Sequence, residues 1–368
     1  MGSIDTLSIT GFKSIRKLDR LQLRSLNVLI GANGVGKSNF VSYFRMLNEL
    51  IEGRLQVWAS KQGGADRILT FGVKETSTIE SSIRFASNGY DFMLEPTSDD
   101  GFTFSPEMLY FDGPIYGVTR PRLGSGHNES HLKKEMNGGN SEKIATYCYN
   151  AISQWKVFHF HDTSDTAGVR RLGALHDNSY LRPDASNLAA FLYSLKESES
   201  KTCYEQIVKT VRLAIPFFDD FVLRPQKLPT EEEQIRLLWK QKDSDYALWP
   251  SQLSDGSIRF ICLVTALLQP KPPSTIIIDE PELGLHPFAI ALLAGLLRSS
   301  SMRMQVIVST QSAPLVDEFS FDDLIVVERE QGATVFKRLD EKDFTDWLDD
   351  YTVSELWQKN ILGGRPRN

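Results

Sequence analysis

The chain has 368 residues, 41% hydrophobic and 24% charged, with a formal net charge of −6. This is a globular composition that favours two lobes, and the acidic balance argues against a generally basic nucleic-acid binder while leaving a local basic face open. No apolar run is long enough to span a membrane, no secretion signal opens the chain, and the three cysteines are scattered, so we expect a cytoplasmic protein.

Residues 1–150 are predicted to hold a phosphate-loop unit followed by a β lobe. Two alternating segments flank the turn Gly11-Phe12-Lys13-Ser14-Ile15, and an apolar run over residues 27–30 indicates a buried strand. Alternating segments between about residues 66 and 112, separated by turn residues, favour antiparallel hairpins. Residues 113–142 are rich in Gly, Pro, Asn and charge, and we expect a flexible loop there.

The run Gly31-Ala32-Asn33-Gly34-Val35-Gly36-Lys37-Ser38 fits the phosphate-binding pattern between a strand and a helix. Glycines let backbone N–H groups face phosphates, and a helix N-terminus adds partial positive charge. In this pattern Lys37 reaches the β- and γ-phosphates, and the Ser38 hydroxyl is a ligand of Mg²⁺. The residues predicted to bind ATP here are Asn33, Gly34, Val35, Gly36, Lys37, Ser38 and Asn39.

Helices dominate residues 151–250, which we interpret as a helical lobe, and an α/β pattern returns over residues 251–335. Within the helical lobe, His159 and His161 lie on one face of a predicted strand, next to Asp162. No further ligand spacing supports a metal site there, so we expect these residues to be structural.

Two carboxylates, Asp279 and Glu280, follow the apolar strand 275–278. Ligand sites of parallel α/β sheets lie at the carboxyl ends of strands. We therefore expect Asp279 to hold Mg²⁺, usually through water, and Glu280 to orient and deprotonate the attacking water. About 25 residues earlier, Leu253-Ser254-Asp255-Gly256-Ser257 opens a helix with Ser254 as its N-cap, which is a typical anion site.

In this order the motifs resemble an ABC-type ATPase of the RecF/SMC class, close to stand-alone bacterial ATPases that are related to OLD proteins and associated with defence. Residues 253–257 match the signature, and Glu282-Leu283-Gly284-Leu285-His286-Pro287 resembles the segment after the catalytic glutamate. Ser309-Thr310-Gln311-Ser312 stands where the class has Ser-Thr-His-Ser. The implied fold is α/β, a P-loop ABC-ATPase head with a parallel-sheet core, an antiparallel β lobe and a helical lobe, without a coiled-coil arm.

The resemblance further implies a head-to-tail homodimer, or a higher even oligomer, that binds ATP and Mg²⁺. Ser254, Asp255 and Gly256 of one subunit would meet the γ-phosphate that Lys37 of the other subunit binds. Lys13 belongs to a turn that approaches the nucleotide in relatives, so it is also predicted to bind ATP.

Gln311 replaces the usual switch histidine. Glutamine can donate a hydrogen bond to a phosphate oxygen but cannot carry a positive charge. We therefore expect slow hydrolysis, with Glu280 and Gln311 as the catalytic residues. For the glutamine of the Q-loop, Gln56 and Gln62 are both open candidates.

These inferences favour an ATPase whose ATP-dependent dimer controls a partner effector, a nuclease or toxin, in a bacterial anti-phage module. About 50 residues follow the switch segment, fewer than an appended nuclease domain needs, so the effector would be a separate protein. The tail, residues 336–368, either docks a partner or packs on the core. The main alternative is a RecF-like DNA-binding repair ATPase; a non-hydrolysing scaffold, a transporter ATPase and a small-molecule kinase fit less well.

Overall fold

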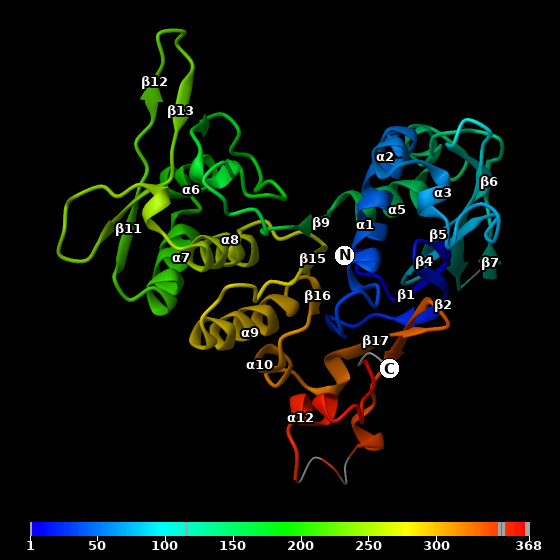
Figure 1. The fold of residues 1–368 in the computed structure, drawn as a ribbon. Coiled ribbons are helices and arrows are strands. Elements are labelled where there is room, and N and C mark those ends of the chain that lie inside the picture. The colour runs from blue at the N-terminus through cyan, green and yellow to red at the C-terminus, as the bar shows by residue number, and fades with distance from the viewer. Residues whose placement is uncertain (1, 115–116, 345–346, 348–349, 365–368) are drawn as a thin grey trace. The chain divides into compact units, whose positions relative to one another are not determined.

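The computed structural model describes residues 2–114, 117–344, 347 and 350–364. They form two compact units, whose elements are labelled in Figure 1. Unit 1 comprises Met1–Val157, Pro273–Ile277 and Met304–Asn368, and unit 2 comprises Phe158–Pro272 and Ile278–Arg303. Each unit thus draws on separate stretches of the chain, and the predicted divisions at residues 150, 250 and 335 stay predictions.

A seven-stranded antiparallel sheet in unit 1 has the order β2-β1-β4-β5-β6-β7, and β8 also pairs with β6. Its strands are β1 Thr6–Phe12, β2 Ile15–Gln22, β4 Ile79–Phe85, β5 Asn88–Pro96, β6 Phe102–Gly113, β7 Gly117–Thr119 and β8 Arg122–Gly124. Side chains alternate between the faces, so that Ile79 and Ile83 are buried while Glu80 is exposed. The expected hairpins are therefore present.

The helices of unit 1 pack around an aromatic core. They are α1 Lys37–Ile51, α2 Leu55–Gln62, α3 Ala65–Ile68, α4 Leu132–Met136 and α5 Glu142–Ser153. Helix α1 contacts α2 and α5, and α5 contacts β5 and β6 of the sheet. The Phe44 ring meets Trp155 edge to face with 5.4 Å between centroids, and Phe12 meets Tyr43 in the same way at 5.7 Å. This packing fixes α1 directly after the phosphate loop.

A second sheet carries the phosphate loop and has the order β18-β17-β3-β16-β15-β9. Its strands are β3 Leu26–Ile30, β9 Trp155–Phe158, β15 Thr275–Asp279, β16 Gln305–Thr310, β17 Leu324–Glu330 and β18 Ala333–Arg338. Strand β3 runs parallel to β16 and β17, and β18 is antiparallel to β17. Every residue of β3, β15 and β16 is buried, which is typical of parallel strands.

Unit 2 combines four helices with short strands. The helices are α6 Leu188–Glu197, α7 Lys201–Ala214, α8 Asp255–Leu268 and α9 Pro287–Ser301, and α7 contacts the other three. Strand β11 (Phe218–Val222) pairs with β14 (Leu238–Gln241). A small sheet has the order β10-β13-β12, with bounds Gly173–Ala174, Glu233–Ile235 and Gln226–Lys227, and 3-10 helices span Gly168–Arg170 and Pro250–Gln252. The expected helical lobe thus also contains small sheets.

The tail packs back onto unit 1. Helix α12 (Val353–Gln358) contacts α10 (Ala313–Val316), as Figure 1 shows, and Leu356, Trp357 and Leu362 are buried. Short 3-10 helices span Phe321–Asp323 and Glu341–Asp343. Residues 365–368, which belong to the expected docking tail, lie outside the described residues.

The α/β fold class with a parallel-sheet core and an antiparallel β lobe is confirmed. Among the described residues, the longest helices are α1 and α9 with 15 residues each, so this part of the chain contains no coiled-coil arm. Segment 113–142, expected to be a flexible loop, instead contains β7, β8 and α4; residues 115–116 of that segment lie outside the described residues.

The buried carboxylate of Glu107 on β6 gives that segment its order. It accepts hydrogen bonds from the hydroxyls of Tyr90 and Ser130, each at 2.6 Å, and from the backbone N–H of His131 at 2.9 Å. The Nε2 atom of His127 lies 2.8 Å from the same carboxylate. A carboxylate can be buried only when such donors replace water, and here three of them come from residues 127–131.

We predict that Glu107→Ala lowers the free energy of unfolding by about 3 kcal/mol, because two hydroxyls and a backbone N–H lose their buried acceptor. Urea unfolding followed by tryptophan fluorescence measures this change. Glu95→Ala on the exposed side of β5 is the matched control and should change stability by less than about 0.5 kcal/mol. Equal stability of the two variants would contradict the role given to Glu107.

Candidate functional site

The phosphate loop lies between β3 and α1, in the predicted strand–loop–helix order. Gly34 and Gly36 adopt left-handed backbone angles, with φ of 79° and 113°. A side chain on Gly31 would place its Cβ 2.4 Å from the carbonyl oxygen of Val327. At each of these positions a larger residue would therefore strain the backbone or collide with a neighbouring atom.

The Lys37 side chain lies across this loop and is only 5% exposed. Its ammonium donates hydrogen bonds to the carbonyl oxygens of Gly31 at 2.7 Å and Ala32 at 3.1 Å. Ser38, the next residue, is exposed at the start of α1. The charge of Lys37 is thus held inside the loop, where the pattern requires it for phosphate binding.

Residues far away in sequence brace the loop. The hydroxyl of Thr334 on β18 donates to the carbonyl oxygen of Val35 at 2.7 Å and lies 2.6 Å from the hydroxyl of Ser14. Asn39 donates its amide to Ser14 at 2.7 Å. A Cβ on Gly36 would lie 2.0 Å from the Thr334 hydroxyl, so only glycine leaves room for this contact. Sequence analysis missed Thr334, because one threonine on a strand has no distinctive pattern.

Lys13 lies beside α1, in the turn predicted to approach a nucleotide. Its ammonium donates to the Ser42 hydroxyl at 2.8 Å and to Oε1 of Gln62 at 3.1 Å. Burial lowers the pKa of Lys13, and the nearby charge of Arg45 lowers it further. Next to these groups is an open hollow of about 510 Å³, lined by Lys13, Asn39, Gln62, Asp66, Phe71 and Arg329 among others.

The two glutamines considered for the Q-loop differ in their surroundings. Gln56 donates to the carbonyl oxygens of Phe102 and Asn128 and accepts from the N–H of Phe102, so its amide connects α2 to β6 and its neighbouring loop. Gln62 lines the hollow beside Lys13. Of the two glutamines, Gln62 therefore lies at an open hollow, whereas the amide of Gln56 is hydrogen-bonded within the protein.

In unit 2, Asp279 ends β15 and is 7% exposed, and Glu280 follows it with a left-handed φ of 45°. Such a backbone angle is strained for a residue other than glycine and is frequent at functional sites. His161 donates its Nε2 hydrogen to the Asp279 carbonyl oxygen at 3.0 Å. The rings of His159 and His161 stack with 4.1 Å between centroids and 12° between planes.

This stacking gives the histidine pair a structural arrangement. His159, His161 and Asp279 each bring a possible metal-ligand atom within 4.8 Å of the others, but the lone pairs of an imidazole lie in its ring plane, and two nearly parallel stacked rings aim theirs in parallel and not at one point. Asp162 is turned to Ser164, whose N–H and hydroxyl it accepts at 3.1 and 2.7 Å. His161 instead fixes the backbone just before Glu280.

The signature segment begins α8 as predicted, and Ser254 is its N-cap. The Ser254 hydroxyl oxygen accepts from the N–H of Ser257 at 3.1 Å. A Cβ on Gly256 would lie 2.1 Å from the carbonyl oxygen of Gly284, so the signature packs directly on the segment after Glu280. Both Ser254 and Asp255 are exposed.

Two arginines that sequence analysis missed hold the signature in place. Arg170, with a side chain only 6% exposed, binds the Asp255 carboxylate at 2.7 Å and donates to the carbonyl oxygens of Pro250 and Leu253. Arg259 on α8 donates to the carbonyl oxygens of Phe160 and Leu283. Burial lowers the pKa of Arg259. Neither arginine lies in a motif, and their partners are 24 to 99 residues away.

The switch segment follows β16 in unit 1. Ser309 and Thr310 are buried at the end of this strand, whereas Gln311 is exposed. Ser312 caps α10, and its N–H donates to the Thr310 hydroxyl at 3.0 Å. The exposed position of Gln311 after a buried strand fits a residue that contacts a ligand.

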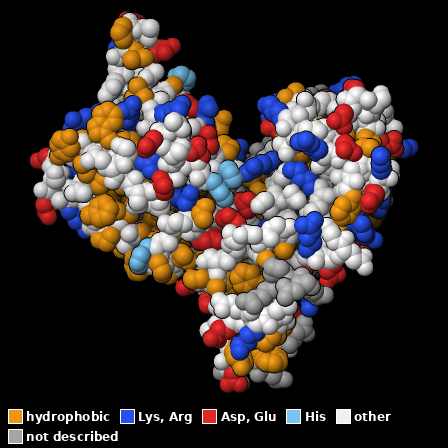
Figure 2. Space-filling view, viewed as in Figure 1, with side chains coloured by type: hydrophobic (Ala, Val, Ile, Leu, Met, Phe, Trp, Pro, Cys, Tyr) orange, Lys and Arg blue, Asp and Glu red, His pale blue; other side chains and the backbone are white. Residues whose placement is uncertain are grey.

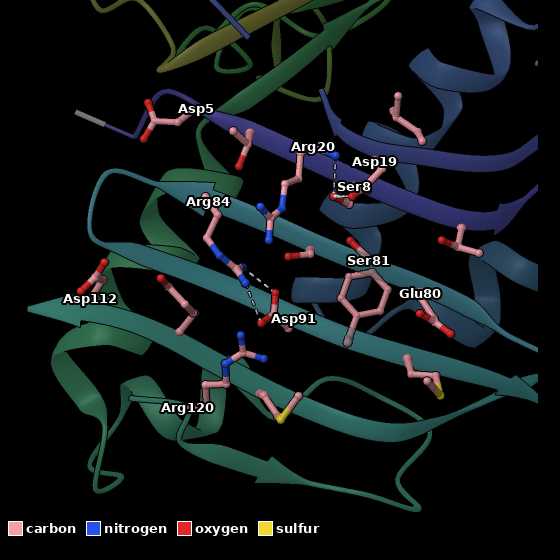
Figure 3. A pocket seen from close by; sticks show the side chains of 18 of the residues that line it. Asp5, Ser8, Asp19, Arg20, Glu80, Ser81, Arg84, Asp91, Asp112 and Arg120 are labelled. Carbon is pink, nitrogen blue, oxygen red and sulfur yellow. Dashed lines mark hydrogen bonds and ion pairs between the residues drawn. The ribbon is translucent and has the colours of Figure 1, made fainter. Parts of the chain in front are cut away.

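A larger hollow, of about 970 Å³, lies on the outer face of the antiparallel sheet (Figure 3). Arg84 and Asp91 form a two-pronged ion pair across it at 2.5 and 3.0 Å, and the Arg84 guanidinium lies 4.0 Å from the Tyr110 ring centre. The groove is polar and open, and none of the motif residues lines it. Thr10 on β1 and Lys17 on β2, which lie on either side of the opening turn, are the lining residues nearest to a motif. The phosphate loop, and not this groove, is therefore the candidate site.

Comparisons with known proteins agree with the motifs. Residues 150–318 match the model of a family described as "AAA domain, putative AbiEii toxin, Type IV TA system". The matched region includes the signature, Asp279, Glu280 and Gln311, and the phosphate loop lies outside it. None of the curated proteins with which the sequence was compared is significantly similar.

Solved structures match over almost the whole chain. An SMC head domain bound to the C-winged helix domain of ScpA is 16% identical, with a TM-score of 0.60, covering 92% of this chain and 99% of that one. An SMC head with an extended coiled coil, bound to the C-terminal domain of ScpA from Pyrococcus furiosus, is 15% identical, with a TM-score of 0.56 and coverage of 95% and 99%. At such identities the likeness concerns the fold.

Within the described residues, every helix is too short or too polar to cross a membrane. The sheet topology, the motif order and the two comparisons agree. The chain therefore has the fold of SMC head domains, and its residues 150–318 are similar to the AAA domain family named above.

Proposed function

We propose that the chain binds ATP together with Mg²⁺ and hydrolyses it. The observation that carries this proposal is the phosphate loop, in which Gly34 and Gly36 take left-handed angles and the Lys37 ammonium lies against the loop carbonyls. In this proposal Lys37 binds the β- and γ-phosphates, and the N–H groups of residues 33–39 surround them. The matched AAA family and the SMC head fold support the nucleotide as ligand.

The motif pattern assigns the metal to the Ser38 hydroxyl and, separately, to the Asp279 carboxylate, which belong to different units. Both offer oxygen atoms, which are the ligands that Mg²⁺ prefers. When bound, Mg²⁺ neutralises phosphate charge. Glu280, at the next position, would take the proton of the attacking water as general base. The strained backbone of Glu280 supports a functional role for this residue.

We place the base and ribose in the hollow beside Lys13. The exposed Phe71 ring, 42% accessible, offers an aromatic face for a base. Asn39 and Gln62 also line this hollow and supply amides that can hydrogen-bond. Lys13, whose pKa is lowered by burial, gains a favourable anionic neighbour if the phosphates lie close by.

We further propose that ATP joins two copies of the chain head to tail, as a homodimer or a higher even oligomer. The γ-phosphate on the other copy would be met by the exposed signature residues Ser254 and Asp255 and by Gly256, which follows them. The Arg170 ion pair supports this, because it offsets the Asp255 charge that would otherwise repel a phosphate. Both solved relatives were crystallised with a protein partner, which supports partner binding by this class of head.

The partner controlled by this dimer would be an effector, a nuclease or toxin, in a bacterial anti-phage module. The family description names a toxin and a type IV toxin–antitoxin system, which supports a two-protein arrangement. We place the protein in the cytoplasm, where its three free cysteines stay reduced. If the purified chain alone cleaves DNA or RNA, this division of labour is wrong.

The face drawn in Figure 2 shows basic and acidic side chains intermingled rather than a continuous basic surface. DNA-binding proteins gather Lys and Arg where phosphates lie. This face therefore gives no support to a RecF-like repair ATPase, which stays the second candidate only by resemblance.

We predict that Lys37→Ala abolishes ATP binding, because the loop loses the charge that meets the phosphates.

Glu280→Gln should bind ATP and Mg²⁺ normally, lose at least about 100-fold in hydrolysis, and double in mass with ATP. Isothermal titration measures binding, phosphate release measures hydrolysis, and light scattering measures mass.

The matched control is Lys209→Ala, an exposed lysine on α7, which should behave as wild type. Wild-type affinity in Lys37→Ala would refute ATP binding at this loop. A mass of Glu280→Gln that is indifferent to ATP would refute the ATP-dependent dimer and leave the binding site intact.

Gln311→His should raise the hydrolysis rate several-fold, because histidine can become positively charged next to the γ-phosphate. The gain over wild type should grow as the pH falls through about 6.5, where a histidine becomes protonated. Gln311→Leu, which cannot hydrogen-bond, should instead slow hydrolysis. Rates measured between pH 5.5 and 8 test this, and identical rates for all three proteins would remove Gln311 from the catalytic residues.

A further inference from the structure

Residues 352–364 connect two parts of unit 1 that belong to the proposed ATP site. At one end, Thr352 caps α12 and Ser354 follows it. The N–H and hydroxyl of Ser354 both donate to the carboxylate of Asp317, each at 2.7 Å. Asp317 is the C-cap of α10, the short helix that begins directly after the switch segment. The first end of this stretch is therefore attached to the element that follows Gln311.

At the other end, the same stretch reaches the phosphate loop. The N–H of Ala32 donates to the carbonyl oxygen of Gly364 at 3.0 Å. The N–H of Gly364 in turn donates to Oε1 of Glu328 on β17 at 2.8 Å. Gly364 is buried with a left-handed φ of 84°, and a Cβ there would lie 3.6 Å from the Cα of Gly31. The backbone of residue 364 thus lies against the first two residues of the loop.

Between these ends the stretch is packed rather than slack. Leu356 is fully buried, and Trp357 and Leu362 are 8% and 4% exposed. The N–H of Ile361 donates to the carbonyl oxygen of Leu356, which closes the turn after α12. This packing fixes the distance between the two attachment points of the stretch, so that a displacement at one end is transmitted to the other.

We propose that residues 352–364, which we name the C-terminal tether, position the phosphate loop and the switch segment relative to each other. This inference rests on the proposed function. Glu328 is the key positioning residue: its carboxylate holds Gly364, and Gly364 holds the N–H of Ala32. With the loop held in this way, ATP meets an ordered binding site and does not have to order the loop itself. A partner that displaces the tether would weaken nucleotide binding.

Glu328→Ala removes the acceptor of the Gly364 N–H at one attachment. Ser354→Ala weakens the other attachment, because the hydroxyl donor to Asp317 is lost while the backbone N–H still donates. Both variants leave the apolar anchors of the tether in place. We expect Glu328→Ala to bind ATP about tenfold more weakly, because the charged acceptor of a buried backbone hydrogen bond is lost. Glu328→Gln, which keeps an acceptor oxygen, should restore most of the affinity. Glu330→Ala, two residues further on the same strand and exposed, is the matched control.

Two measurements on the intact chain accompany the affinities. Hydrogen exchange without nucleotide reports on residues 31–36, whose exchange should be faster in Glu328→Ala than in Glu330→Ala. Ser354→Ala should lower kcat more than it raises KM, since its attachment lies on the switch side. Equal thermal midpoints of Glu328→Ala and Glu330→Ala would show that a general loss of folding is not the cause.

The outcomes separate the two proposals. Unchanged ATP affinity and unchanged exchange in Glu328→Ala overturn the tether, even if the wild type binds ATP as proposed. If the wild type binds no ATP, the proposed function fails, and the exchange measurement alone decides the tether. Weaker binding in Glu328→Ala with a lower thermal midpoint, and no rescue by Glu328→Gln, would also overturn it.

Discussion

The carbonyl groups of the phosphate loop need hydrogen-bond donors, and this need organises the surroundings of the loop. A loop that turns N–H groups toward a ligand turns carbonyls the other way, and a buried carbonyl without a donor is costly. Lys37 satisfies Gly31 and Ala32, and Thr334 satisfies Val35. Gly36 must lack a side chain for the Thr334 hydroxyl to come this close. The loop is therefore shaped by β18 as much as by its own glycines.

The same principle governs unit 2, where the donors are arginines. Arg170 and Arg259 donate to backbone carbonyls around the signature and around the segment after Glu280. Burying a guanidinium is unfavourable, as the lowered pKa of Arg259 reflects, and the carbonyl hydrogen bonds offset that cost. Because Gly256 touches the carbonyl of Gly284, a displacement of α8 moves the segment that follows Glu280.

The features that could be predicted from the sequence are those with a local signal. The glycine spacing, the flanking strand and helix, the N-cap at Ser254 and the apolar strand before Asp279 each lie within a few consecutive residues, and the structure contains all of them. Single polar residues that act at a distance in sequence could not be predicted. Arg170 and Thr334 are 85 and 299 residues from their partners, and an isolated arginine or threonine carries no periodic pattern.

The polar composition of the segment after β6 predicted a flexible loop, but several of its polar residues contact the buried Glu107 and do not face water. The roles of Lys37, Glu280 and Gln311 in chemistry stay predictions, because they depend on a ligand and not on the fold.

The neighbours of β3 in its sheet have a consequence for biosynthesis. This strand pairs with β16 and β17, which a ribosome makes almost three hundred residues after it, and Thr334 comes later still. During translation the emerging N-terminal half contains the complete glycine-rich sequence but none of the strands that hold it in shape. The proposed ligand, ATP, would therefore not assist early folding of the nascent chain, since a ligand stabilises only a site that already exists. In the proposed function, nucleotide binding would be a late checkpoint of synthesis, available only to chains whose second half has been made and has folded back onto the first.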